Sequence, residues 1–172
     1  MTKRVYLSLG SNIQREHYIR AALDALSAQF GDLTISSVYE SESVGFAGSP
    51  FYNLVVGLQT DLSLEQLSDY LKKLEDANGR DRSAPKFASR TLDVDIVMVD
   101  DWVGNYAGIE LPRPELYYNA YVLWPMAELL GEQGEPKTGQ SFASLWRAFE
   151  SEQRLQPIAF TWRGQSLGGA GA

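Results

Sequence analysis

Two carboxylates stand two residues apart in the segment RTLDVDIVMVDD, which covers residues 90–101. Alternate side chains of a β-strand point to the same face, so Asp93 and Asp95 are expected to lie side by side, with Thr91 on the same face. The apolar residues of the segment are expected to face the core together: Leu92, Val94, Ile96 and Met98. A pair of carboxylates can bind a hard cation such as Mg²⁺, which removes their mutual repulsion. The alternative is that both carboxylates simply face water.

Four basic side chains precede this pair: Arg80, Arg82, Lys86 and Arg90. Cations beside a metal-binding carboxylate pair suit a polyanionic ligand, because arginine guanidinium groups match phosphate oxygens. A nucleoside triphosphate is the obvious candidate. The alternative is a set of surface ion pairs, each worth ~0–1 kcal/mol. Together the two features favour phosphoryl-type transfer.

A third pair of residues suggests a binding slot for a flat ring. Phe51 and Asn53 share one face of a predicted strand, which places an aromatic plane beside an amide that both donates and accepts hydrogen bonds. This combination suits a nitrogen-rich heterocycle, although a core phenylalanine next to a strand-end asparagine fits the pattern equally well. The sequence contains neither GxxxxGK[ST] nor GxGxxG before a helix, so any nucleotide site is built in another way.

The elements that must position these residues follow from the hydrophobic pattern. Alternation and β-branched residues predict strands at 4–9, 33–40 and 51–58 and in the segment with the two aspartates. Helical spacing predicts one helix that ends at Gly31 and a second that runs from a capping box, Ser63 with Gln66, to Gly79. Residues 10–12 (GSN) are expected to turn the chain, and a last helix is expected over residues 141–149. The order predicts an α+β protein with a ferredoxin-like βαββαβ core, an antiparallel sheet with helices packed on it, and C-terminal additions.

Composition limits the functional classes. The chain has 172 residues and a net charge of −7, without a block of basic residues, so nucleic acid and an anionic membrane are not expected partners. It contains no cysteine and no apolar run near the ~20 residues of a membrane span, and we expect a cytoplasmic protein. His17, the single histidine, is expected on the surface. We expect one domain over residues 1–162 and a disordered, glycine-rich tail over residues 163–172.

Over roughly residues 4–130 the chain resembles the 6-hydroxymethyl-7,8-dihydropterin pyrophosphokinase family of folate biosynthesis. The resemblance rests on LGSN, SSVYES, FYNLVV, LEDANGRDR, RTLDVDIVMVD, LPRP and YVLWPMAEL, in this order. GRxR followed at this separation by RTLDxDI is a specific signal. The resemblance implies a ferredoxin-like fold and transfer of pyrophosphate from ATP to the hydroxymethyl oxygen of the pterin, with release of AMP and with two Mg²⁺ ions.

The resemblance also implies roles for individual residues. Asp93 and Asp95 match the residues that hold the metal ions. The residues that match the nucleotide site are Glu75, Arg80, Arg82 and Arg90; Arg80 and Arg90 match the arginines that contact phosphates and developing charge. The residues that match the pterin site are Ser41, Val44, Phe51, Asn53 and Tyr121.

Four positions depart from the family pattern. Arg113 stands where a histidine is usual, Asn119 where an arginine is expected, Gly108 where a basic residue lies near adenine and ribose, and Phe87 where tryptophan is frequent. Arg113 can still supply charge to an ATP phosphate. Because these changes thin the outer ATP contacts, two alternatives stay open. One is a divergent paralogue that binds a pterin with weak or no kinase activity. The other is a transferase with a different acceptor or nucleotide.

Overall fold

The computed structural model describes residues 2–41, 50–79, 91–151 and 153–167. Its centre is an antiparallel sheet with the strand order β5-β1-β4-β3-β8, in which β2 also pairs with β4. The strands are β1 (Lys3–Ser11), β2 (Thr34–Ile35), β3 (Val38–Ser41), β4 (Phe51–Thr60), β5 (Asp93–Val99) and β8 (Leu155–Ile158). The predicted α+β class with an antiparallel sheet is therefore confirmed.

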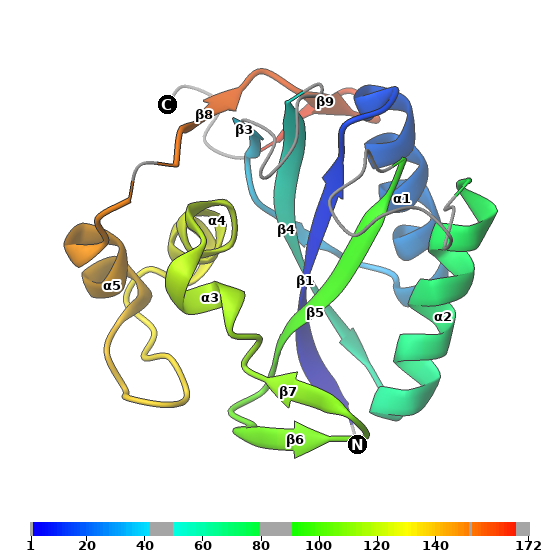
Figure 1. Ribbon diagram of the computed structural model, residues 1–172. Helices are drawn as coiled ribbons and strands as arrows, with labels where there is room; N and C mark the ends of the chain where they lie inside the picture. The colour runs from blue at the N-terminus through cyan, green and yellow to red at the C-terminus, as the bar shows by residue number, and fades with distance from the viewer. Residues whose placement is uncertain (1, 42–49, 80–90, 152, 168–172) are drawn as a thin grey trace.

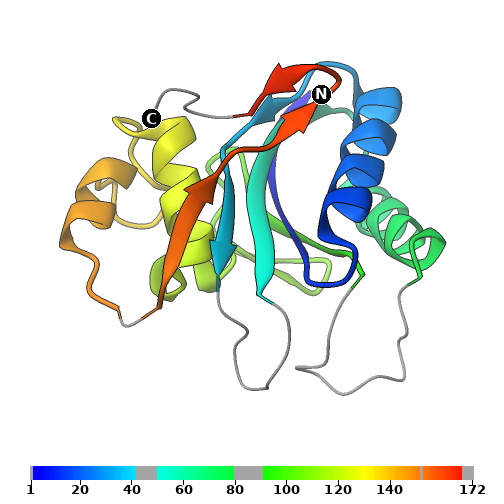
Figure 2. The same ribbon diagram turned by 90° about the horizontal axis from the view of Figure 1, so that it is seen from above.

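Helices lie on both sides of this sheet (Figures 1 and 2). On one side are α1 (Arg15–Phe30) and α2 (Leu64–Ala77); on the other are α3 (Glu115–Tyr118), α4 (Ala120–Leu130) and α5 (Phe142–Ala148). Each side has its own apolar core. Leu7, Leu54 and Val94 belong to the core under α1 and α2, whereas Tyr6, Val55 and Val97 belong to the core under α3 to α5.

Local sequence signals set the limits of the two long helices. Helix α1 ends at Gly31, whose φ of 83° is a left-handed value that glycine adopts without steric cost. Helix α2 begins with the predicted capping box: the Gln66 main-chain N–H donates to the Ser63 hydroxyl at 3.1 Å, and the Ser63 N–H donates to the Gln66 side chain at 3.0 Å. Both predictions are confirmed.

The second predicted strand is divided into β2 and β3 at Ser36 and Ser37. Ser36 keeps its pairing with β4, because its N–H donates to the Val55 carbonyl at 3.0 Å. The Ser37 N–H instead turns to α4 and donates to the Glu128 carboxylate at 3.0 Å. Tyr39 donates to the same carboxylate at 2.6 Å. A tertiary contact thus interrupts a strand that the alternation pattern made continuous.

A bulge in β5 corrects the predicted position of Met98. Leu7 pairs with Ile96 and Tyr6 pairs with Met98, so Val97 is an extra residue without a partner on β1. An extra residue reverses the alternation of faces beyond it. Met98 therefore joins the core under α3 to α5, and the prediction that it lies with Val94 and Ile96 was wrong.

Regular secondary structure extends closer to the C-terminal end than the sequence predicted. A small hairpin of β9 (Thr161–Trp162) and β10 (Gln165–Ser166) follows β8, and Leu167 is buried against the core under α1 and α2. Residues 163–167, which were expected to belong to a disordered tail, are therefore part of the folded structure. Apolar burial of Leu167 outweighs the glycine-rich composition there.

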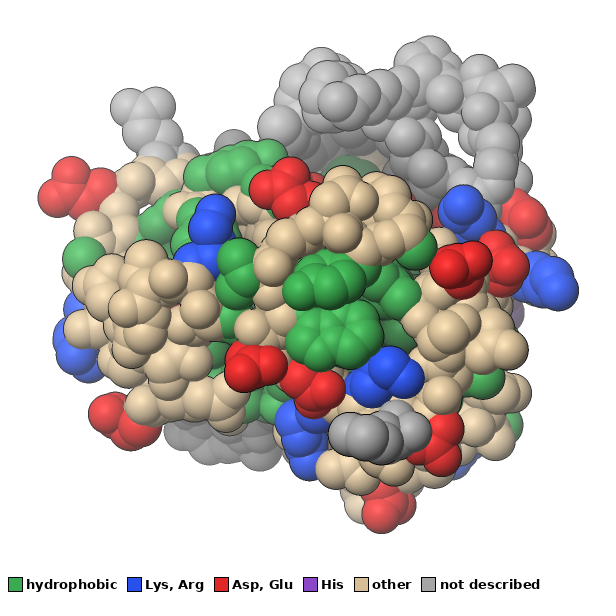
Figure 3. All heavy atoms as spheres, turned by 90° about the horizontal axis from the view of Figure 1, so that it is seen from below, with side chains coloured by type: hydrophobic (Ala, Val, Ile, Leu, Met, Phe, Trp, Pro, Cys, Tyr) green, Lys and Arg blue, Asp and Glu red, His purple; other side chains and the backbone are tan. Residues whose placement is uncertain are grey.

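A second hairpin, β6 (Gly104–Tyr106) with β7 (Ile109–Leu111), follows β5 at the lower end of the sheet in Figure 1. The rings of Trp102 and Tyr106 pack with their centroids 4.9 Å apart. Seen from below, hydrophobic side chains gather at the centre of this face, with acidic and basic side chains around them (Figure 3).

Candidate active site

The predicted metal ligands and the predicted ring-binding residues lie on the same face of the sheet. Gly10, in the central strand β1, pairs with Asn53 on β4 and with Asp93 on β5. Directly paired residues of antiparallel strands project to the same side, so Asn53 and Asp93 flank Gly10 on the side of α3 and α4. With neighbouring strands ~4.8 Å apart, their backbones lie roughly 10 Å from each other.

Gly10 is required by this arrangement. A Cβ at this position would lie 2.9 Å from the Asn53 Oδ1 atom and 3.6 Å from the Phe51 ring. The prediction that Gly10 begins a turn was wrong, because β1 runs on through Ser11. The missing side chain of Gly10 leaves the Asn53 amide and the Phe51 ring the space that a Cβ would occupy.

The ring-binding residues are brought together on β3 and β4. Ser41 pairs with Phe51 across these strands, and the Asn53 Nδ2 atom donates to the Ser41 hydroxyl at 2.8 Å. Both Ser41 and Asn53 are buried. This hydrogen bond ties the Asn53 side chain to β3, and in the described arrangement its Oδ1 atom lies on the Gly10 side.

A cavity of ≈ 260 Å³ opens at the free edge of β5. Asp93, Asp95, Glu75, Lys72, Ile109 and Arg113 are among the side chains that line it. Glu75 reaches this edge from α2 and accepts the outward Val94 N–H at 2.8 Å. The structure thus brings Glu75 and the two aspartates to one cavity.

Arg113 lies at the acidic pair because the backbone holds it there. Its N–H donates to the carbonyl of the bulge residue Val97 at 2.8 Å, directly after the cis Leu111–Pro112 peptide bond. Its guanidinium lies 3.6 Å from Asp95 and donates from Nε to Glu115 at 2.7 Å. Arg113 therefore places its positive charge between the Asp95 and Glu115 carboxylates.

The Asp95 carboxyl group carries the largest electrostatic strain of the site. Burial, the neighbouring Asp93 carboxylate and the charges of Glu75 and Glu115 raise the pKa of Asp95 to about 7, although Arg113 acts to lower it. Carboxylates that resist ionisation beside one another favour a cation between them. Among the residues that the structure describes, no group of three His, Cys, Asp or Glu side chains is arranged to hold a metal ion. The donor set fits Mg²⁺, which commonly takes one or two carboxylates together with substrate phosphates.

We expect Asp95→Asn to stabilise the metal-free protein at alkaline pH. A folded-state pKa raised from 3.8 to about 7 means that unfolding releases a proton, so the free energy of unfolding falls as pH rises through this window. Since 34% of the side chain is exposed, solvent weakens the effect, and the variant should gain roughly 1–2 kcal/mol at pH 8 and little near pH 4. Urea unfolding in EDTA at both pH values measures this. Asp101→Asn, which removes an exposed carboxylate, is the control. If Asp95→Asn is no more stable than wild type at pH 8, the pKa of Asp95 is not raised in the folded protein.

Tyr121 approaches the same face from α4. Burial, followed by the charges of Glu115 and Asp95, raises the pKa of Tyr121 to about 12, which places its phenol within the field of the acidic pair. Its hydroxyl accepts a hydrogen bond from the Asn119 Nδ2 atom at 2.9 Å. Asn119, the position where the family pattern suggested an arginine, is buried and turned inward rather than toward the cavity.

Several predicted residues lie outside the described part of the chain: Val44, Arg80, Arg82, Phe87 and Arg90. Three further residues of the site, Gly10, Glu115 and Gln153, were not predicted from the sequence. The glycine in LGSN carried a usable signal, because a glycine inside an apolar strand marks a close approach. Gln153 carried none, since its partners are 33 and 34 residues away.

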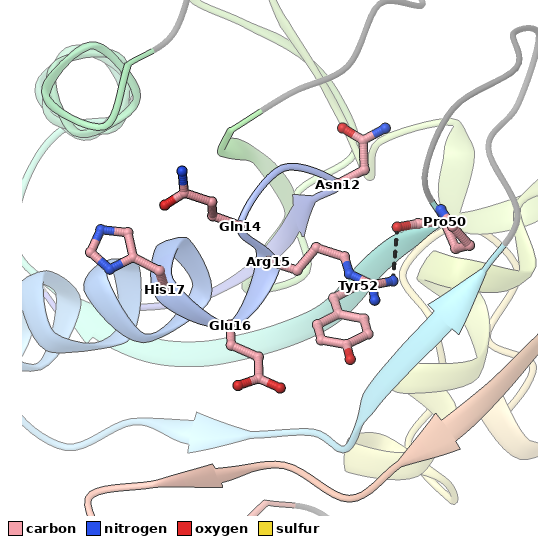
Figure 4. A pocket seen from close by; sticks show the side chains of 7 residues that line it. All are labelled: Asn12, Gln14, Arg15, Glu16, His17, Pro50 and Tyr52. Atoms are coloured by element: carbon pink, nitrogen blue, oxygen red, sulfur yellow. Dashed lines mark hydrogen bonds between the residues drawn. The ribbon is translucent and has the colours of Figure 1, made fainter.

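A second cavity, of ≈ 400 Å³, lies at the start of α1 (Figure 4). It is lined by Asn12, Gln14, Arg15, Glu16, His17, Pro50 and Tyr52. The Arg15 guanidinium lies 3.9 Å from the centre of the Tyr52 ring and 2.8 Å from Glu40. None of the predicted site residues lines this cavity, and His17 is exposed, as expected.

Comparison with known proteins identifies relatives of this chain. Residues 6–131 match the family model for 7,8-dihydro-6-hydroxymethylpterin-pyrophosphokinase. The chain is 34% identical to 2-amino-4-hydroxy-6-hydroxymethyldihydropteridine pyrophosphokinase of Pseudomonas aeruginosa, over 90% of the chain and 98% of that enzyme. It is 31% identical to the Bacillus subtilis enzyme of the same name, over 86% and 92%.

Longer relatives match over only part of their length. The chain is 32% identical to the folic acid synthesis protein fol1 of Pneumocystis carinii, of which it spans 22%. Solved structures of Plasmodium falciparum HPPK-DHPS share the fold, and one superposes with a TM-score of 0.68 at 13% identity, covering 86% of this chain and 45% of that one. In the part of the chain that the structure describes, no helix is long and apolar enough to cross a membrane.

Proposed function

Because the chain belongs to the 7,8-dihydro-6-hydroxymethylpterin-pyrophosphokinase family, we propose that it transfers pyrophosphate from ATP to the hydroxymethyl oxygen of 6-hydroxymethyl-7,8-dihydropterin, with release of AMP, in folate biosynthesis. One observation carries the proposal. The central-strand residue Gly10 lies between Asn53 and Asp93 on one face of the sheet, so a ring read by Asn53 can present its side chain to phosphates held at Asp93.

The pterin slot consists of Phe51, Asn53, Ser41 and Tyr121. The Asn53 amide, held in place by its bond to Ser41, hydrogen-bonds the edge of the ring, and the aromatic rings of Phe51 and Tyr121 stack on its faces. Stacking and edge hydrogen bonds together orient the hydroxymethyl group toward the acidic pair. Val44, outside the described residues, is assigned to the same slot from the family pattern.

Asp93 and Asp95 are proposed to hold two Mg²⁺ ions with the phosphates of ATP. Two bound Mg²⁺ ions would neutralise phosphate charge and align the entering and leaving oxygens. Glu75 fixes the edge of β5 through Val94, so the two carboxylates keep their positions when the ligand enters. The reaction then depends mainly on positioning and electrostatics rather than on covalent work by the protein.

The arginines supply the opposite charge. Arg80, Arg82 and Arg90 are assigned to the phosphates from the family pattern, and they lie outside the described residues. Arg113 pairs with Asp95 and Glu115, and we propose that its guanidinium turns to a phosphate when cations neutralise the carboxylates. A rigid guanidinium fork suits this exchange, because it binds carboxylate and phosphate oxygens with similar geometry.

The proposed fold is ferredoxin-like. The chain order β1-α1-β3-β4-α2-β5 has the βαββαβ sequence of this motif, with β2 as an outlying piece of the second strand. The strand order β5-β1-β4-β3 supports this assignment, because α1 and α2 each connect two strands that are not neighbours in the sheet: β4 lies between β1 and β3, and β1 lies between β4 and β5.

An assay for AMP tests the function. We expect the protein with Mg²⁺, ATP and 6-hydroxymethyl-7,8-dihydropterin to form AMP, and to form none when the pterin is omitted. AMP without pterin would indicate hydrolysis or another acceptor. Pterin binding without AMP would reject the kinase in favour of the binding-only alternative considered from the sequence.

A further inference from the structure

Tyr121 is connected to the C-terminal part of the chain by a row of three hydrogen bonds. The Ala120 main-chain N–H donates to Gln153 Oε1 at 2.6 Å, Gln153 Nε2 donates to Asn119 Oδ1 at 2.9 Å, and Asn119 Nδ2 donates to the Tyr121 hydroxyl at 2.9 Å. We call Gln153 and Asn119 the amide relay. Gln153 lies beyond residues 6–131, which match the family model.

The direction of this row is fixed by chemistry. A main-chain N–H can only donate, so the oxygen of Gln153 must face Ala120 and its NH₂ group must face Asn119. The oxygen of Asn119 must then face Gln153, and its NH₂ group must face Tyr121. The Tyr121 oxygen is therefore an acceptor within the row, and its own proton is left for another partner.

Nothing in the described part of the chain accepts that proton. Tyr121, in the first turn of α4, is half-buried against the core under α3 to α5 and lies in the field of Asp95 and Asp93. Because burial and these charges raise the pKa of Tyr121 to about 12, the hydroxyl stays protonated at neutral pH. The Tyr121 hydroxyl is a partly desolvated donor beside Asp93 and Asp95, so it gains most from an oxygen or nitrogen acceptor on a bound ligand.

We infer that Tyr121 donates a hydrogen bond from its hydroxyl to an acceptor on the bound pterin, and that Gln153 and Asn119 are positioning residues that orient this donor. The inference rests on the proposed function, since it assigns a further contact within the proposed pterin slot. It also explains why the chain has an asparagine at position 119: an arginine cannot accept from Gln153, so the relay would be broken.

Tyr121→Phe tests the donor, because it keeps the stacking ring and removes only the hydroxyl. We expect the dissociation constant for 6-hydroxymethyl-7,8-dihydropterin, measured by calorimetry with Mg²⁺ and a non-hydrolysable ATP analogue, to rise roughly 3–10-fold. In turnover assays the pterin KM should rise while kcat is largely retained. Unchanged affinity and unchanged KM in this variant would overturn the inference.

Gln153→Glu tests the relay. A carboxylate still accepts from Ala120 but cannot donate to Asn119, so the Asn119 amide must rotate and present its oxygen to Tyr121. The Tyr121 hydroxyl would then donate its proton to the Asn119 oxygen and could no longer donate a hydrogen bond to the ligand. We expect this nearly isosteric change to weaken pterin binding about as much as Tyr121→Phe does, and to add nothing in the Tyr121→Phe background.

Gln156→Glu, at an exposed position of β8, adds the same charge to the same segment without touching the relay, and should bind pterin like wild type. A loss in Gln153→Glu that persists in the Tyr121→Phe background would mean a purely structural role and would overturn the relay. Failure of the wild-type protein to bind pterin would instead reject the proposed function. The two failures are therefore separate.

Discussion

Replacement of Asp95 by alanine is expected to lower kcat at least ~1,000-fold, or about 4 kcal/mol of transition-state stabilisation. Asp95 is the carboxylate whose pKa is raised to about 7 by burial and by three acidic neighbours, so it has most to gain from a cation. Without it, the phosphates of ATP lose the alignment that an in-line displacement needs.

Pterin affinity should remain within a factor of ~2 in the same variant, because the proposed ring contact, Asn53, lies two strands away on β4, with β1 in between. Quenched-flow measurement of AMP gives the rate, and calorimetry with the pterin gives the affinity. Asp101→Ala removes an exposed carboxylate from the same segment and serves as the control. Equal losses of turnover and pterin affinity would show that Asp95 contacts the ring rather than the metal ions.

Asn53→Ala should weaken pterin binding by about 1–3 kcal/mol, which corresponds to roughly 5- to 150-fold in the dissociation constant. The amide is buried, and its side chain is held in place by the 2.8 Å hydrogen bond to Ser41, so a bound ring edge meets a pre-formed partner. Its removal leaves polar atoms of the ring desolvated without a hydrogen bond.

Calorimetric titration of the variant with 6-hydroxymethyl-7,8-dihydropterin measures this loss. Gln59→Ala, at an exposed position of the same strand, is the matched control for changes in β4 itself. A thermal unfolding scan of both variants separates lost contacts from lost fold. If Asn53→Ala folds and binds pterin as tightly as wild type, the slot lies elsewhere on the molecule.

The local elements of the fold were predictable because their signals lie within a few residues. The alternation in β4, the capping box at Ser63 and the glycine at position 31 each depend on short-range geometry, and the structure confirms them. The same holds for two pairs of residues that share a strand face, Asp93 with Asp95 and Phe51 with Asn53. Side chains two residues apart point to the same side of a strand whatever the partner strand is.

Other features depend on which segments meet in space. The bulge at Val97 reverses the expected side of Met98, and it also supplies the carbonyl that holds Arg113 at the acidic pair. The break at Ser37 exists because Glu128 arrives from α4 to accept its N–H. The local sequence pattern around each of these residues does not predict such contacts.

The sequence by itself determined the chemistry that is present: the acidic pair, the ring-and-amide pair and their places on strands. Tertiary structure alone decided that Gly10 joins the two pairs on one face, and that Gln153 and Asn119 orient Tyr121. The physical reason is range. Strand periodicity and helix capping act between near neighbours, whereas strand register and hydrogen bonds across 34 residues arise only when the chain has packed.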